Sequence, residues 1–279
     1  IRGKFCAQRL ASQQRRRHEL ASAPAADDVA ARVVAGCTQL VPSSVAAAAA
    51  KLKSGELDLA MIPSVEYLKE ANHYRLLPDF VIASRGPVAT VLFAAKTHLE
   101  SVRSIAIDNR SKTSISMLQI LFADSLAPDV QYVPTHPDSA AMLAAHDAAL
   151  VIGDQAFMLG KSISDNTTVY DLSEEWFKRT GKTFVHAVVA MRPETKLSKE
   201  ILDVFSLVRG EILREIPRIA DTASRQLEID AKTCEDYLRN KIVYDFGKNA
   251  MEGLAHFRDL CVERGLIEHK HPLRFIDTP

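Results

Sequence analysis

Short apolar runs alternate along the chain with stretches in which apolar residues recur at every third or fourth position. The first pattern is typical of buried strands and the second of amphipathic helices. The runs predict strands at Arg32–Leu40, Leu57–Ile62, Val88–Ala94, Ile105–Asp108, Val130–Val133, Ala148–Ile152, Thr168–Leu172 and Phe184–Ala190. The periodic stretches predict helices at Val45–Lys53, from Ser64, at Thr113–Leu126, at Ser139–Ala145, from Asp154, and at Glu174–Thr180. This alternation predicts an α/β fold with mixed, mostly parallel sheets.

The last part of the chain has the helical period throughout. It predicts a helical C-terminal segment with helices at Lys199–Ile216, Thr222–Ile229, Cys234–Asn240 and Asn249–Arg264. The two long apolar strands at Val88–Ala94 and Phe184–Ala190 bracket the middle of the chain, which indicates two lobes. We therefore expect residues 1–89 and 185–279 to build one lobe, residues 90–184 to build a second, and a ligand cleft to lie between them.

Composition and charge narrow the classes of partner. The 279 residues are 47% hydrophobic, and 35 Lys and Arg balance 35 Asp and Glu, so the net charge gives no reason to expect nucleic acid or a membrane surface as partner. No apolar stretch approaches the roughly 20 residues that cross a bilayer. The four cysteines are far apart and form no C-x-x-C pair, which suits free thiols in a reducing cytosol. A small molecule is therefore the expected partner.

A hydroxyl-rich turn, Ser111-Lys112-Thr113-Ser114, stands between a predicted strand and a predicted helix. A helix that begins there directs backbone N–H groups, hydroxyl donors and the positive end of its dipole toward one point, which suits a carboxylate or a phosphate. Serine and threonine are also common helix caps, so the turn alone allows both interpretations.

Three further polar residues, Ser64, Thr90 and Asp154, stand at the ends or starts of predicted strands. Ligands of open α/β sheets bind beyond the carboxyl ends of the strands, so a cleft between the lobes would collect these residues together with Ser111–Ser114. Each has a structural alternative, because Ser64 and Asp154 can cap helices and a strand threonine is commonly part of the packing.

Signatures of several enzyme classes are absent from the sequence. It contains no H-E-x-x-H, G-x-S-x-G, P-loop or G-x-G-x-x-G motif, and His269-Lys270-His271 stands in a polar tail without further ligands. Hydrolase, metalloenzyme and dinucleotide-binding functions therefore have no support, and no metal site is expected.

Six ordered motifs together resemble a known family, the chorismate dehydratases of the futalosine route to menaquinone. The motifs are Leu40–Ser43, Gly55–Tyr67, Gly86–Val91, Ser111–Ser114, Ile152–Ala156, and Trp176 with Thr180-Gly181 and Phe184-Val185. Each motif is weak alone, but their order and spacing make the resemblance specific, and it runs from about Leu40 to the C-terminus.

The resemblance implies a two-lobed, type II periplasmic-binding-protein-like fold used in the cytoplasm as a carbon–oxygen lyase. It implies that chorismate loses water to give 3-[(1-carboxyvinyl)oxy]benzoate without a metal or an organic cofactor, with the enolpyruvyl carboxylate of the substrate as the base. On the family pattern Ser111, Thr113 and Ser114 would bind a carboxylate. The catalytic hydroxyl, a serine in the family's Gly-Pro-Val-x-Ser, falls on Thr90, whose added methyl group narrows its rotamers.

The N-terminal segment departs from the family pattern. Family members open with a strand that carries Leu-Asn-x-x-Pro-Leu, whose asparagine contacts the substrate, and Ile1–Ala30 contains no such motif. Either a catalytic residue has been lost or the N-terminal sequence is not the native one. Two other functions stay open: a non-catalytic binding protein for a small carboxylate, and the sibling synthase that makes 1,4-dihydroxy-6-naphthoate. A homodimer is an open alternative to a monomer.

Overall fold

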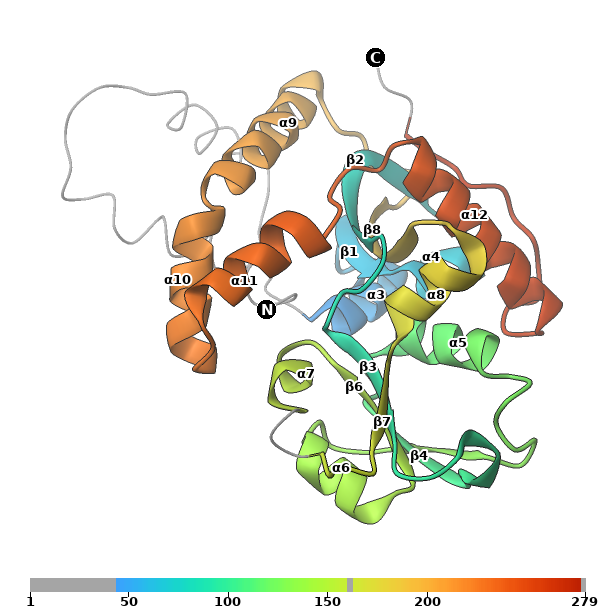
Figure 1. Ribbon diagram of the computed structural model, residues 1–279. Helices are drawn as coiled ribbons and strands as arrows, with labels where there is room; N and C mark the ends of the chain where they lie inside the picture. Colours follow the sequence, from blue (N-terminus) through green and yellow to red (C-terminus); the bar gives the residue numbers. More distant parts are fainter. Residues whose placement is uncertain (1–43, 160–162, 277–279) are drawn as a thin grey trace.

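The computed structural model describes residues 44–159 and 163–276. The strand predicted at Arg32–Leu40 and the atypical segment Ile1–Ala30 lie outside the described residues. The described chain forms two sheets, with most helices packed around them (Figure 1).

The first sheet has three strands in the order β1-β8-β2. They are β1 (Leu59–Pro63), β8 (Phe184–Met191) and β2 (Arg75–Ser84), and both pairs are antiparallel. All eight residues of β8 are buried because it is the central strand, and it is the long apolar run that the sequence predicts. The sequence prediction missed β2, where the register with β8 shifts between Leu76 and Val81. The residues at this irregularity include Pro78, which lacks an N–H group and interrupts the strand pattern.

The second sheet has five strands in the order β5-β4-β6-β3-β7. They are β5 (Gln131–Pro134), β4 (Ser104–Ile107), β6 (Ala148–Ile152), β3 (Val91–Ala95) and β7 (Thr168–Asp171). The strand β4 is parallel to β5 and β6, whereas β3 is antiparallel to β6 and β7. The sheet is mixed, as predicted, but parallel pairing among the described strands is confined to β4. The chain passes between the sheets on its way into β3 and into β8, and these two strands run against their neighbours.

The helices between the strands agree closely with the hydrophobic pattern. They are α3 (Val45–Ser54), α4 (Ser64–Lys69), α5 (Lys112–Leu121), α6 (Ser139–Ala145), α7 (Asp154–Met158) and α8 (Leu172–Thr180). Helix α3 begins as predicted after Ser44, whose Oγ accepts a hydrogen bond from the Ala47 N–H at 3.2 Å. It ends at Gly55, which has φ +82°, and α8 ends at Gly181 in the same left-handed conformation.

The C-terminal segment is helical, as predicted. It contains α9 (Lys199–Arg214), α10 (Ile216–Leu227), α11 (Ala231–Asp236), a π-helical turn at Tyr237–Lys241, and α12 (Lys248–Glu263). The predicted start of α10 at Thr222 is several residues late, because Pro217 occupies the first turn, where its missing N–H costs nothing. In Figure 1, α10 and α11 lie to one side of the two sheets, and α12 lies beside the three-stranded sheet.

Aromatic side chains join α8, β8 and α12 in the core. The Trp176 ring lies 5.1 Å from the Phe184 ring and 5.9 Å from the Phe257 ring, and all three side chains are fully buried. Helix α12 approaches the chain just before β8 so closely that a Cβ atom on Gly253 would lie 1.8 Å from the carbonyl oxygen of Thr183. Glycine is therefore required at this crossing.

Candidate functional site

A pair of buried hydroxyl groups joins the start of α4 to the start of α5. Ser64 Oγ donates a hydrogen bond to the Val185 carbonyl oxygen of β8 at 2.7 Å and lies 3.5 Å from Thr113 Oγ1. The Val65 N–H donates to the same Thr113 oxygen at 3.4 Å. Ser64 follows β1 directly and Thr113 stands in the first turn of α5, so two helix N-termini converge at this point.

The turn before α5 is not an ordinary serine cap. Ser111 occupies the N-cap position, but its side chain accepts no hydrogen bond from the helix N–H groups. Its hydroxyl instead donates back to the Asp108 carbonyl oxygen, and Ser111, Thr113 and Ser114 are all buried. Of the two interpretations of this turn, capping by the Ser111 side chain is therefore wrong.

An aspartate–arginine pair lies beside this turn. The Arg110 guanidinium donates to both carboxylate oxygens of Asp108, with its Nη2 2.6 Å from Oδ2, and the Asp108 carboxylate is buried. These hydrogen bonds raise the pKa of Arg110, and the negative charge of Asp154 raises it further. The charge of Asp154, the first residue of α7, is thus close enough to act on the Arg110 guanidinium, which follows β4.

Thr90 lies at the start of β3 in a second buried hydroxyl pair. Its Oγ1 donates to the Tyr237 hydroxyl oxygen at 3.2 Å, and its carbonyl oxygen accepts from the Gly153 N–H at 2.9 Å. The ring of Phe157 in α7 packs edge-on against Tyr237, with 5.7 Å between the ring centroids. Thr90, Asp154 and Tyr237 therefore come from three distant segments and gather at one end of β3.

The sequence-predicted residues thus fall into two groups. Ser64 and Thr113 are in hydrogen-bonding contact, with Ser111 and Ser114 in the adjoining turn. Thr90 and Asp154 are neighbours through the hydrogen bond from Gly153. Both groups offer hydroxyl or helix N–H donors, which can bind and orient a carboxylate and stabilise a developing negative charge.

Sequence reasoning missed Tyr237 and the Asp108–Arg110 pair. Tyr237 lies 147 residues from Thr90 along the chain, inside a helical apolar pattern, so nothing local marks it. It begins a π-helical turn, a rare conformation that is frequent at functional sites but has no reliable sequence signature. Asp108 is the last residue of a predicted strand and Arg110 lies two positions after it, which is the one signal that could have drawn attention to them.

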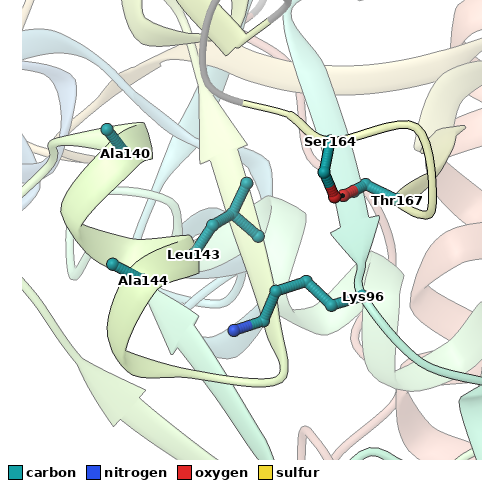
Figure 2. A pocket seen from close by; sticks show the side chains of 6 residues that line it. All are labelled: Lys96, Ala140, Leu143, Ala144, Ser164 and Thr167. Carbon is teal, nitrogen blue, oxygen red and sulfur yellow. Dashed lines mark hydrogen bonds between the residues drawn. The ribbon is translucent and has the colours of Figure 1, made fainter.

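Two cavities lie at the opposite end of β3 from Thr90. Figure 2 shows the first, of about 310 Å³, which is lined by Lys96, Ala140, Leu143, Ala144, Ser164 and Thr167. The second, of about 630 Å³, shares Lys96 and extends to Asp124 and Tyr170. None of the sequence-predicted site residues lines either cavity.

Residues 44–159 and 163–276 contain neither a candidate metal site nor a candidate membrane-spanning helix. They contain no group of three or more histidine, cysteine, aspartate or glutamate side chains that could hold a metal ion. No helix within them has the length and apolar character needed to cross a membrane.

Comparison with known proteins decides the family. The menaquinone biosynthesis family matches residues 33–263. A curated chorismate dehydratase from Thermus thermophilus is 30% identical over 204 residues, which are 68% of this chain and 74% of that protein. The chain belongs to the chorismate dehydratase family. The resemblance seen in the six ordered motifs is thereby confirmed.

Solved structures confirm the fold expected of this family. A protein from Archaeoglobus fulgidus aligns with a TM-score of 0.63 and 17% identity over 82% of this chain and 88% of its own. The alkanesulfonate-binding protein SsuA from Xanthomonas axonopodis pv. citri, bound to MOPS, aligns with a TM-score of 0.57 and 12% identity over 96% and 92%. At such identities the likeness shows the fold alone, which is periplasmic-binding-protein-like.

Proposed function

We propose that the protein is a cytoplasmic carbon–oxygen lyase that converts chorismate to 3-[(1-carboxyvinyl)oxy]benzoate in the futalosine route to menaquinone. The 30% identical relative named chorismate dehydratase supports the substrate and the reaction. The observation that carries the proposal in this chain is Thr90. On the resemblance to the family pattern it corresponds to the catalytic serine, and its hydroxyl is buried and hydrogen-bonded to Tyr237.

In the proposed reaction the substrate supplies its own base. The enolpyruvyl carboxylate takes a ring proton, the electrons of that C–H bond enter the ring, and the bond between the ring carbon and its hydroxyl oxygen breaks, while the ether bond to the enolpyruvyl group stays intact. The hydroxyl group leaves with a proton as water, and the ring becomes aromatic. No metal or organic cofactor takes part. The chain has then to hold two carboxylates and to stabilise charge on the leaving oxygen, which are tasks of positioning and electrostatics.

The site residues divide these tasks. We assign a substrate carboxylate to the N-terminus of α5, where Thr113 and Ser114 supply hydroxyls and the turn that begins at Ser111 supplies helix N–H groups. Ser64 reaches the same point from α4. Thr90 Oγ1 donates a hydrogen bond to the departing ring hydroxyl, and Asp154, which follows the Gly153 bonded to the Thr90 carbonyl oxygen, orients the same hydroxyl.

Access to this site requires the two lobes to separate. We divide the chain into residues 1–89 with 185–279 and residues 90–184, a division supported by the two sheets. Both buried hydroxyl contacts then cross the boundary, since Ser64 meets Thr113 and Thr90 meets Tyr237. Chorismate would bind by replacing these contacts.

Incubation with chorismate followed by mass spectrometry tests the activity. We expect a product lighter by one water, and absence of turnover at high enzyme concentration would defeat the proposal. Thr90→Val removes the hydroxyl at nearly constant shape and should lower kcat by about 100-fold or more, as for other lost donors at a reacting oxygen. Thr90→Ser should retain activity. Thr135→Val, at the end of β5, serves as the matched control.

A non-catalytic carboxylate-binding protein is the second candidate. It is favoured by the absence of the Leu-Asn-x-x-Pro-Leu motif from Ile1–Ala30. Calorimetry that detects chorismate binding, with no product in the same preparation, would select this function over the enzymatic one.

A further inference from the structure

The carboxylate of Asp171 binds four backbone N–H groups from two separate segments. Its Oδ2 accepts from Val88 at 2.8 Å and from Ala89 at 2.6 Å. Its Oδ1 accepts from Ser173 at 3.0 Å and from Glu174 at 3.1 Å. The first pair belongs to the turn before β3 and the second pair to the start of α8.

Within the described residues, these two segments are the connections between the sheets. Residues 85–90 lead from β2 in the three-stranded sheet to β3 in the five-stranded sheet, and α8 leads from β7 back to β8. Asp171 is the last residue of β7, so its carboxylate ties one connection to the other. In Figure 1, β3 and β7 lie side by side, and because they are antiparallel, β3 leads away from the three-stranded sheet whereas β7 leads back toward it.

The turn that Asp171 holds has an unfavourable backbone conformation. Ala89 has φ +59°, in the left-handed region that residues with a Cβ atom rarely adopt. Two hydrogen bonds to one carboxylate oxygen compensate for this conformation. Thr90 follows directly, so the backbone at Ala89 sets the direction in which the Thr90 hydroxyl points toward Tyr237.

Capping of α8 accounts for only half of this arrangement. Other aspartate caps in the protein bind N–H groups of their own helix, as Asp138 does at Ala141 and Asp230 at Thr233. Asp171 also caps its own helix, but through Oδ1, and its Oδ2 reaches residues 82 and 83 positions away in sequence. The second oxygen therefore serves the turn that carries Thr90.

We propose that Asp171 is a positioning residue that fixes the Thr90 hydroxyl for the reaction and couples the two connections between the lobes. The claim that Asp171 fixes the Thr90 hydroxyl for the reaction rests on the function proposed for Thr90, whereas the claim that it couples the two connections does not. Asp171 acts through the backbone at residues 88–89 and touches no substrate.

The variant Asp171→Asn, which directs an NH₂ group toward N–H donors, tests this assignment. We expect kcat for chorismate to fall by about 100-fold, as for a displaced catalytic group, with a much smaller change in KM. Amide hydrogen exchange at residues 88–90 should accelerate. Adding Ala89→Gly, which removes the steric cost of positive φ, should restore at least about 10-fold of the lost kcat. Asp147→Asn is the matched control, since its carboxylate accepts from the Arg103 and Ser104 N–H groups at the opposite end of the five-stranded sheet and should leave kcat unchanged.

The outcomes separate the two proposals. An inactive wild-type protein would defeat the proposed function, and exchange at residues 88–90 would still decide whether Asp171 holds the turn. Unchanged exchange in Asp171→Asn, or lost activity that Ala89→Gly does not restore, would overturn the positioning role. If Asp171→Asn does not fold, Ala89→Val replaces it, because a β-branched residue strains the same turn with the carboxylate intact. A wild-type kcat in Ala89→Val would equally overturn the assignment.

Discussion

Substituting alanine for Gly253 should destabilise the protein strongly because the crossing of α12 over the chain before β8 has no room for a methyl group. The new Cβ would lie 1.8 Å from the Thr183 carbonyl oxygen and 2.9 Å from its carbonyl carbon, both backbone atoms that no rotamer change can move. The helix must retreat by roughly 1.2 Å before the closest contact reaches 3.0 Å. A gap of that size removes a large part of the dispersion energy between Phe257 and the Trp176–Phe184 pair.

Two opposing effects set the change in the free energy of unfolding that Gly253→Ala causes. Overpacking against backbone costs about 3 kcal/mol, and alanine offers about 1 kcal/mol over glycine in a helix interior, so the free energy of unfolding should fall by about 2 kcal/mol. Gly210 in α9 provides the control, because it is exposed and a Cβ there meets no atom within 4 Å. Gly210→Ala should therefore gain up to about 1 kcal/mol.

Urea unfolding followed by far-UV circular dichroism measures both variants against the wild-type protein. The same chemical change at two helical positions should shift stability in opposite directions. A Gly253→Ala protein as stable as the wild type would show that α12 does not approach Thr183 as described, and would refute the reasoning.

Two further predictions concern side chains that anchor the backbone. Ser64→Ala leaves the buried Val185 carbonyl oxygen without its hydroxyl donor and should lower the free energy of unfolding by about 1–3 kcal/mol in urea titrations, so a neutral effect would contradict the hydrogen bond. The Arg103 N–H, followed by the Ser104 donors, lowers the pKa of Asp147. The pKa of the Asp147 carboxyl is thus lower in the folded protein than its value of about 4 in the unfolded chain. The stability that Asp147 adds relative to the Asp147→Asn variant is therefore fully present above about pH 4, and it is lost as the pH falls through the folded pKa. Thermal unfolding of the wild type and of Asp147→Asn from neutral pH to pH 3 should show that the difference in stability between them shrinks as the pH falls. A difference that does not change with pH would exclude this effect.

Local signals were sufficient for most of the fold. Helix α6 and strand β6 have the predicted bounds, because at each of them the periodic pattern of apolar residues ends where polar residues begin. Helix α5 ends at Leu121 instead of Leu126, and β2 was missed altogether. The pairing of β2 with β8 depends on residues 100 or more positions away, and its irregular register hides the alternation that marks a strand.

The candidate site could be predicted only in part, for a related reason. Ser64, Thr90 and Asp154 stand at strand ends, and strand ends are visible in the sequence. The partners that give these residues their surroundings are not visible, since Tyr237 and Asp171 reach Thr90 and its turn through tertiary contacts alone. Residue types and order identified the family, whereas the contacts that orient the hydroxyl required the folded chain.

The central place of β8 has a consequence for how the protein is made. Both described partners of β8 precede it in the chain, so β1 and β2 leave the ribosome long before Met191 does. The five-stranded sheet, by contrast, has all of its strands once Asp171 has been synthesised. At ordinary translation rates of about 5–20 residues per second, β2 waits roughly 5–20 s for β8. The nascent chain thus completes its five-stranded sheet first. Strands β1 and β2 then need protection from aggregation until β8, their shared partner, emerges.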